Sequence, residues 1–224
     1  MNLIIGDSHI RSLQWCKSHN NIFREYRASS VRGLINKNSN SGARNKILDL
    51  VNSLDYKKLF IMFGKVDIEW VYPYKLKKET IELNNFIEDT TDKYIQFISE
   101  ISDSFEEIYV LGIHLPALEE DDMLSHLNRL SAIESVSSKS FMQKNLNKIK
   151  HIGSLKQRTE ETITFNNILY NKVKDKKWNY MDVTHELMDE KTNTCKKFFI
   201  SHQDHHLNEN KVGMVWHKKI ESIL

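Results

Sequence analysis

The sequence predicts a three-layer α/β/α sandwich with a central parallel sheet of about five strands. Short apolar runs alternate with amphipathic segments along the 224 residues, and Gly and Pro number only 7 and 2. This alternation is typical of parallel sheets covered by helices, and the low Gly and Pro content excludes a collagen-like or linker-like chain. Since a domain usually takes about 100 to 200 residues, we expect one domain over residues 1–224.

Each expected strand is a short run in which apolar residues dominate. The runs cover Asn2–Ile5, Ile22–Ala28, Lys58–Phe63, Glu107–Leu111 and Trp178–Val183. The first run ends at a glycine, and the third holds the longest strongly apolar stretch of the chain. Because amphipathic segments fill the gaps, we expect helical crossovers between parallel strands and a flavodoxin-like topology.

Apolar residues at three- and four-residue steps predict the helices. A helix capped by Ser41 carries Ile47, Leu48, Val51 and Leu54 on one face. The clearest stripe follows the third strand, at Leu83, Phe86, Ile87, Thr91, Tyr94, Phe97, Ile98, Ile101 and Phe105. A third segment starts near Arg158 and repeats Phe165, Leu169 and Val173. A last helix follows Asn208 with Val212, Val215, Trp216, Ile220 and Ile223 inward.

The stretch Ala117–Lys156 does not fit this alternation. It is long, rich in serine over Ser135–Ser140, and only patchily periodic. We therefore expect a partly helical insertion over residues 117–156 on the loop side of the sheet.

Charge and composition exclude several classes of partner. The 32 basic and 30 acidic residues give a formal charge of +2, and the lysine clusters are scattered, so we expect no nucleic-acid partner. A membrane-spanning helix needs roughly 18 consecutive apolar residues, and the sequence has no such run. The N-terminal MNLIIGDSH has no basic leader, which favours a cytoplasmic location.

The two cysteines predict neither a disulfide framework nor a zinc knuckle. Cys16 and Cys195 belong to no CxxC pair, so we expect idle or buried thiols. No cofactor is expected, and the sequence does not predict an oligomeric state.

Three segments that follow expected strands carry reactive side chains, and such segments meet at the carboxyl edge of a parallel sheet. The first is Gly6–His9, where a sharp turn leaves Ser8 exposed at the start of a helix, with its own N–H near the place where an oxyanion would form. Ser8 is a candidate nucleophile. An equally good interpretation is an ordinary turn in which Asp7 or Ser8 caps the helix.

The second segment, Gly64–Glu69, follows the most apolar strand and is otherwise a polar loop with a turn glycine. The third, Ile200–Leu207, places histidines and Asp204 just before the last helix. A histidine there is well suited to act as general base for a distant serine. The same histidines and Asp204 are also common metal ligands, and a solvated polar loop is a further alternative.

The order of these segments resembles that of the SGNH or GDSL hydrolase superfamily over nearly the whole chain. GDSH at Gly6–His9 is similar to the block that carries the nucleophilic serine, which implies that role for Ser8. ASSVRGLINKNS resembles the second block and implies that the backbone N–H of Gly33 binds the oxyanion. The family's third block, G-x-N-D, is matched at Gly64 and Asp67 but not at its asparagine.

The missing asparagine removes one oxyanion donor, a loss that typically costs about 10² to 10³ in rate. We expect the backbone near Gly64 to contribute, and Lys65 or Arg11 are candidate substitutes. The segments FGKVDIEWVYPYK and QRTEETITFNNIL resemble a subgroup associated with polysaccharide biosynthesis, in which this asparagine is usually absent.

The family's last block, D-x-x-H, implies that His206 is the base. Its aspartate position is Gln203 here, and Asp204 is the nearest carboxylate, so we expect Asp204 to orient His206. His205 is an alternative base. Asp7, Asp67, His114 and Arg158 are further candidates for substrate contacts. For His114 a structural turn is the favoured interpretation, and Arg158 suits an ordinary ion pair equally well.

The resemblance implies a serine-dependent acyl-ester hydrolase that acts on an acylated carbohydrate, with acetyl as the expected acyl group. The substrate is thus a small-molecule or glycan ester, and no metal is needed. Two alternatives stay open. A carbohydrate O-acetyltransferase would use the same acyl-serine intermediate, and a protein that binds glycan without turnover would need neither the asparagine nor the acid.

Overall fold

Five parallel strands form the centre of the computed structural model, which describes residues 1–18, 20–39, 41–76, 80–132, 152–201 and 205–224. The strands are β1 (Asn2–Gly6), β2 (Asn21–Glu25), β3 (Lys58–Met62), β4 (Glu107–Leu111) and β5 (Asn179–Met181). Their order is β2-β1-β3-β4-β5, and each neighbouring pair is parallel. This is the flavodoxin-like order, so the predicted fold class and all five strands are confirmed.

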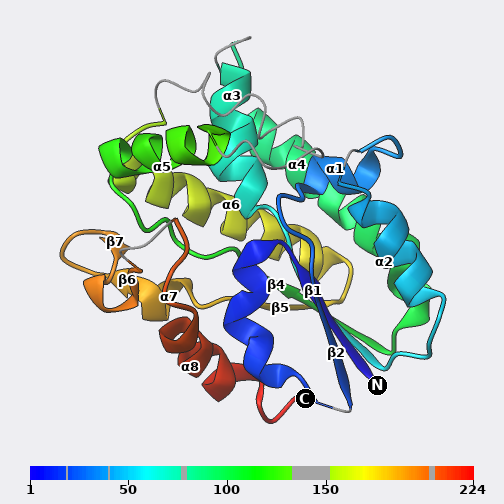
Figure 1. The fold of residues 1–224 in the computed structure, drawn as a ribbon. Helices are drawn as coiled ribbons and strands as arrows, with labels where there is room; N and C mark the ends of the chain where they lie inside the picture. The colour runs from blue at the N-terminus through cyan, green and yellow to red at the C-terminus, as the bar shows by residue number, and fades with distance from the viewer. Residues whose placement is uncertain (19, 40, 77–79, 133–151, 202–204) are drawn as a thin grey trace.

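Helices cover both faces of the sheet (Figure 1). One face carries α1 (Val31–Ile35), α2 (Ala43–Val51), α4 (Leu83–Ile101) and α6 (Leu155–Asp175). The other carries the 3-10 helix η1 (Ser8–Cys16), α7 (Thr184–Leu187) and α8 (Glu209–Ile220). Each face of the sheet has its own hydrophobic core, and successive strand residues point into the two cores alternately. Leu3 and Ile5 pack against the first set of helices, and Ile4 packs against the second.

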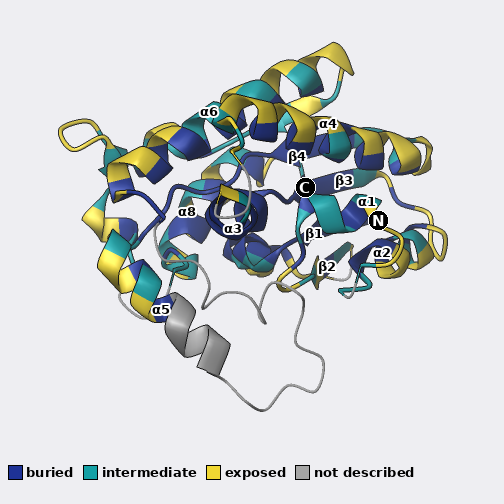
Figure 2. Ribbon diagram, turned by 90° about the horizontal axis from the view of Figure 1, so that it is seen from above, coloured by how far each residue is buried: buried dark blue, intermediate teal, exposed yellow. Residues whose placement is uncertain are grey.

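The amphipathic patterns predict the long helices well. Seen from above, α4 and α6 turn exposed residues outward and buried residues toward the sheet (Figure 2). The predicted start of the last helix after Asn208 is confirmed, and the Asn208 side chain caps it by accepting a hydrogen bond from the Lys211 N–H at 3.1 Å. The helix predicted after Ser41 is confirmed as α2, but its N-cap is Gly42, in a left-handed conformation, and Leu54 lies beyond the helix, 46% exposed.

The segment after β3 is not a polar loop. It forms a π-helical turn, η2 (Asp67–Val71), that continues into α3 (Tyr72–Leu76), and most of it is buried. Above the carboxyl edge of the sheet, α3 lies near α5 (Glu120–Ala132) in Figure 1. Val66, Trp70 and Tyr74 pack there against Met123 and Ile152.

Part of the predicted insertion is helical, since α5 lies within residues 117–156; residues 133–151 lie outside the described residues. The insertion itself stays a prediction. A short antiparallel pair, β6 (Met188–Asp189) and β7 (Thr194–Cys195), follows α7. Neither was predicted, because two-residue strands leave no periodic pattern. None of the helices in the described ranges is long and apolar enough to cross a membrane.

Candidate active site

The site lies where the strand order changes direction. β1 pairs with β3 on one side and with β2, the next strand along the chain, on the other side. Ligands of open α/β sheets bind beyond the carboxyl ends of the strands at such a switch point. The residues directly after β1 and β3 are Asp7–His9 and Phe63–Lys65, and they overlap two of the three predicted segments.

Gly6 permits the close approach of β1 to β3 at this point. A Cβ on Gly6 would lie 2.4 Å from the Met62 carbonyl oxygen and 2.8 Å from the Ile10 Cβ, so a larger residue would force the turn open. The Asp7 N–H donates to the same Met62 oxygen at 3.1 Å. The chain therefore leaves β1 in a fixed direction, which positions Ser8.

Asp7, and not Ser8, caps η1. Its buried carboxylate accepts hydrogen bonds from the backbone N–H of His9 at 2.9 Å and from the His9 ring Nδ1 at 3.0 Å. Burial raises the pKa of Asp7 to about 7. Since Asp7 supplies the cap, the Ser8 side chain is available for another contact.

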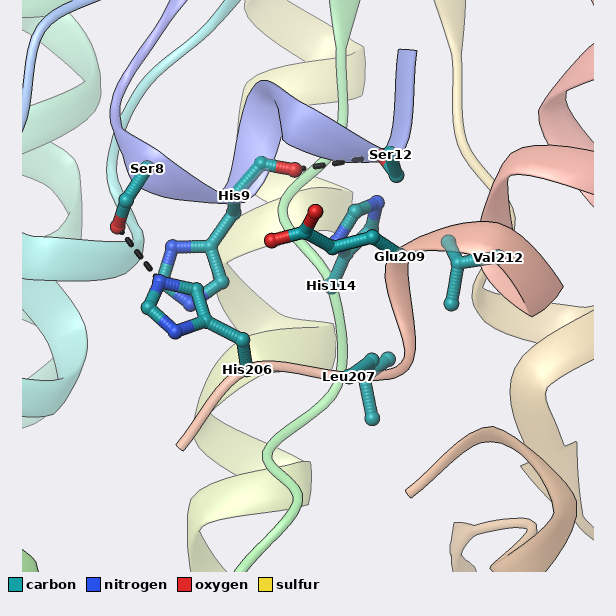
Figure 3. A pocket seen from close by; sticks show the side chains of 8 residues that line it. All are labelled: Ser8, His9, Ser12, His114, His206, Leu207, Glu209 and Val212. Atoms are coloured by element: carbon teal, nitrogen blue, oxygen red, sulfur yellow. Dashed lines mark hydrogen bonds between the residues drawn. The ribbon is translucent and has the colours of Figure 1, made fainter. Parts of the chain in front are cut away.

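That contact is with His206. The Ser8 Oγ lies 2.8 Å from His206 Nε2, and both side chains are partly buried (Figure 3). An isolated bridge between Ile200 and Leu207 closes the loop that carries His206, and Asn208 then caps α8. The structure thus brings together the predicted serine and histidine, 198 residues apart in the chain, in a geometry that lets the ring nitrogen accept the hydroxyl proton.

The predicted acid, Asp204, and its rival Gln203 lie outside the described residues. The role of Asp204 therefore stays a prediction. His205 contacts a different partner from His206, because its Nδ1 lies 2.8 Å from His126 Nε2. Of the two neighbouring histidines, it is His206 that has a hydrogen bond to Ser8.

Three further histidines surround this pair. The His9 ring lies 4.6 Å from the His206 ring and 5.5 Å from the His205 ring, centroid to centroid. Burial lowers the pKa of His9 and His205 well below the usual histidine range and that of His114 to about 3, so all three are neutral near pH 7. His9 was not predicted to have a role, although its place two residues after Asp7 allows the contact between its ring and the Asp7 carboxyl.

His114 has a structural partner, since the Trp216 Nε1–H donates to His114 Nε2 at 2.9 Å. It also lines a small cavity with Ser8, His9, Ser12, His206, Leu207, Glu209 and Val212 (Figure 3). The volume of this cavity is about 10 Å³, which is room for about one water molecule. Glu209, which was not predicted from the sequence, lines this cavity, and its Oε1 lies 3.3 Å from the Arg11 guanidinium.

Gly64 has a backbone conformation that favours glycine, with φ +123°. A Cβ there would lie 2.4 Å from the Phe165 ring, so α6 packs directly on this turn. The next residue, Lys65, is fully buried and its Nζ lies 2.8 Å from Glu69 Oε1. The candidate substitute donors are thus both paired with carboxylates, Lys65 with Glu69 and Arg11 with Glu25.

Asp67 and Arg158, two predicted substrate contacts, are buried and engage backbone groups. The Asp67 carboxylate accepts from the N–H of Val31 at 2.6 Å and of Arg32 at 3.3 Å, which ties the third block to the start of α1. The Arg158 guanidinium donates to the carbonyl oxygens of Gly153 and Leu118. Both residues therefore hold backbone segments in place around the site.

Gly33, the predicted second-block oxyanion donor, lies in α1. Its N–H donates to the Ser30 hydroxyl at 3.0 Å, where Ser30 caps the helix. An oxyanion at this N–H would therefore compete with the Ser30 side chain.

No family model and no curated protein matches this chain, whereas solved structures share its fold. A candidate platelet activating factor from Streptococcus pneumonia superposes with a TM-score of 0.58 at 17% identity, over 99% of this chain and 82% of that one. An acylhydrolase candidate from Bacteroides fragilis gives 0.57 at 10% identity, over 99% and 86%. A GDSL-like lipase from Bacteroides thetaiotaomicron gives 0.55 at 9% identity, over 100% and 88%. The chain therefore has the fold of GDSL-type hydrolase structures.

Proposed function

We propose that this protein is a serine-dependent acyl-ester hydrolase in which Ser8 is the nucleophile and His206 the general base. The observation that carries the proposal is the 2.8 Å contact between Ser8 Oγ and His206 Nε2 at the switch point of the sheet. A hydroxyl is a weak nucleophile unless a neighbouring base accepts its proton, and an imidazole at this distance can do so. The shared fold with GDSL-type hydrolase structures supports the same chemistry.

In the proposed reaction, Ser8 Oγ attacks the ester carbonyl carbon while its proton passes to His206 Nε2. The carbonyl oxygen becomes an oxyanion that accepts hydrogen bonds from the backbone N–H of Ser8 and from the Gly64 region. The Gly33 N–H is a further proposed donor, which would exchange its bond to the Ser30 hydroxyl for the oxyanion. The imidazolium then protonates the leaving alcohol as the acyl–oxygen bond breaks. A water molecule, deprotonated by His206, then attacks the acyl carbon. The imidazolium returns the proton to Ser8 Oγ as the bond between Oγ and the acyl carbon breaks and the acid leaves.

Asp204 is the proposed acid of the triad. An ionised carboxylate would accept the His206 Nδ1–H and stabilise the imidazolium that forms during attack, whereas Gln203 offers only a neutral acceptor. We expect Asp204→Asn to cost far more activity than Gln203→Ala. A Gln203→Asp variant with raised activity would instead favour the usual family spacing.

The proposed substrate is an O-acetylated carbohydrate. Acetyl is the acyl group that the sequence resemblance implies. The carbohydrate part rests on the sequence resemblance to the polysaccharide-associated subgroup, and Asp7, Asp67, His114 and Arg158 are proposed to shape the surrounding pocket from buried positions.

Hydrolysis of p-nitrophenyl acetate tests the nucleophile and base. We expect Ser8→Ala and His206→Ala to lose at least about 10³ in kcat/KM. Ser53→Ala is the matched control and should keep wild-type activity, because it removes an exposed hydroxyl that lies just after α2 and donates to the Leu50 carbonyl oxygen. Equal rates in Ser8→Ala and wild type would overturn the assignment.

A second measurement separates hydrolysis from its alternatives. Release of acetate from an acetylated oligosaccharide supports the hydrolase, and acetyl gain by a sugar acceptor from an aryl acetate donor supports a transferase. Glycan binding that Ser8→Ala leaves intact, with no ester turned over, would make the binding protein the better account.

A further inference from the structure

Three histidines next to Ser8, one buried and two partly buried, have the arrangement of a metal site. His9, His205 and His206 each place one ring nitrogen so that the three atoms lie within 4.8 Å of one another. A serine mechanism needs only one imidazole as its base, so it assigns no role to the other two. We propose that these three histidines bind Zn²⁺ and that the bound ion reversibly inhibits the enzyme.

His9 is prepared for such a role by its neighbour. The Asp7 carboxyl lies 3.0 Å from His9 Nδ1, and in its ionised form it accepts the Nδ1–H, which leaves the lone pair of His9 on Nε2. His9 is 4% exposed, and its Nε2 is buried without a hydrogen-bond partner among the described residues. Metal-binding histidines commonly donate their other ring N–H to a carboxylate in this way, which fixes the tautomer and raises ligand basicity.

His205 has a comparable second contact. Its Nδ1 lies 2.8 Å from His126 Nε2, so in the tautomer that donates to His126 the lone pair of His205 is on Nε2. His9 lies in the first turn of η1, whereas His205 and His206 belong to the loop before α8. The ligands thus come from two segments that the sheet edge already holds together.

The distances are compatible with a tetrahedral ion after small side-chain rotations. Two imidazole nitrogens, each about 2.0–2.1 Å from Zn²⁺, lie about 3.3 Å apart in a tetrahedral site. The longest separation in the cluster therefore has to shorten by no more than about 1.5 Å. The nearby charge of Lys65 does not prevent cation binding, because Glu69 pairs with it at 2.8 Å.

Inhibition follows from the identity of the third ligand, and this part rests on the proposed function. If Zn²⁺ binds His206 Nε2, it occupies the lone pair that accepts the Ser8 proton. If it binds Nδ1, its positive charge opposes formation of the imidazolium. Either way Ser8 loses its base. Imidazole ligands suit Zn²⁺, whereas Mg²⁺ prefers oxygen ligands and should not bind here.

Binding is tested on chelator-stripped full-length protein by calorimetry with Zn²⁺ and by the visible absorption of Co²⁺. We expect one equivalent to bind to wild type and to Ser8→Ala, and at least a tenfold higher Kd in His9→Phe and in His205→Gln. His185→Ala, an exposed histidine outside the cluster, is the matched control and should leave the Kd unchanged. No binding, or a Kd that neither cluster substitution alters in variants folded by circular dichroism, would overturn the proposal.

Inhibition is tested in the aryl acetate assay. We expect Zn²⁺ to lower wild-type turnover at concentrations near the measured Kd, EDTA to restore it, and Mg²⁺ to have no effect. Zn²⁺ that binds and increases turnover would overturn the inhibitory role. If no ester is hydrolysed but the histidine-dependent Zn²⁺ binding is found, the proposed hydrolase fails while the metal site stands.

Discussion

Asp7→Asn tests the electrostatics that hold the turn before Ser8. The carboxylate is fully buried, and its Oδ1 accepts from both the His9 N–H and the His9 ring. Its Oδ2 is buried without a hydrogen-bond partner among the described residues. Burial raises the pKa of Asp7 from 3.8 to about 7, so the folded protein holds a proton that the unfolded chain releases near pH 4.

The sign of the effect follows from proton linkage. Between pH 4 and about 7 the folded state binds more protons than the unfolded state, so this group lowers the free energy of unfolding as pH rises. At about 1.4 kcal/mol per pKa unit, a shift of roughly three units amounts to at most about 4 kcal/mol. Asparagine keeps an oxygen acceptor for His9 and removes the charge, so the variant lacks this slope.

The measurement is urea unfolding of wild type and Asp7→Asn at several pH values from about 4.5 to 8. The buried amide NH₂ of the variant lowers its free energy of unfolding by about 1–3 kcal/mol at every pH. The quantity to compare is therefore the change of the free energy of unfolding with pH. We expect the variant to gain stability relative to wild type as pH rises, by about 3 kcal/mol over this range. Asp49→Asn, an exposed carboxylate on α2, is the control. Parallel pH profiles for wild type and Asp7→Asn would refute the reasoning.

Three further predictions concern stability. Gly64→Ala should cost about 2–4 kcal/mol in urea unfolding, because φ is +123° and the new Cβ meets the Phe165 ring. Gly42→Ala, at φ +59°, should cost about 1 kcal/mol, because the new Cβ would meet only the Lys46 Cε, at 3.9 Å. Trp216→Phe should lower the free energy of unfolding by about 1–3 kcal/mol, because His114 Nε2 loses its donor, and by more because the smaller ring leaves space in the core. Adding His114→Phe should reduce this loss, and an unchanged loss in the double variant would contradict the prediction. Because the pKa of His114 is lowered to about 3, its contribution is present above about pH 6.5 and falls by about 2 kcal/mol between pH 7 and pH 5, a slope that His114→Phe should remove.

The sheet could be predicted from sequence because its central strands are buried on both faces. Leu59–Met62 are all fully buried, so the strand is a continuous apolar run that needs no partner to be recognised. The long helix α4 is equally visible, since its buried residues recur at three- and four-residue steps. Local patterns therefore sufficed wherever burial follows a single period.

The segment after β3 could not be predicted in this way. Lys65, Asp67 and Glu69 give it the composition of a polar loop, but all three are buried. Asp67 is satisfied by backbone N–H groups 35 and 36 positions earlier in the chain, and Lys65 by Glu69 through a helical turn. Burial of charge depends on such partners, and a sequence pattern does not identify them.

The two interpretations of Gly6–His9, a helix cap and a nucleophile, are both compatible with the structure because they use different residues. Had Ser8 capped η1, its oxygen would accept a backbone N–H, and its position would be set by the helix alone. Asp7 takes that N–H instead, so the Ser8 hydroxyl can donate to His206 at 2.8 Å. The same carboxylate holds the His9 ring beside His206. A single buried aspartate thus orients both the proposed nucleophile and the proposed metal ligand, which is why its substitution should affect ester turnover and Zn²⁺ affinity together.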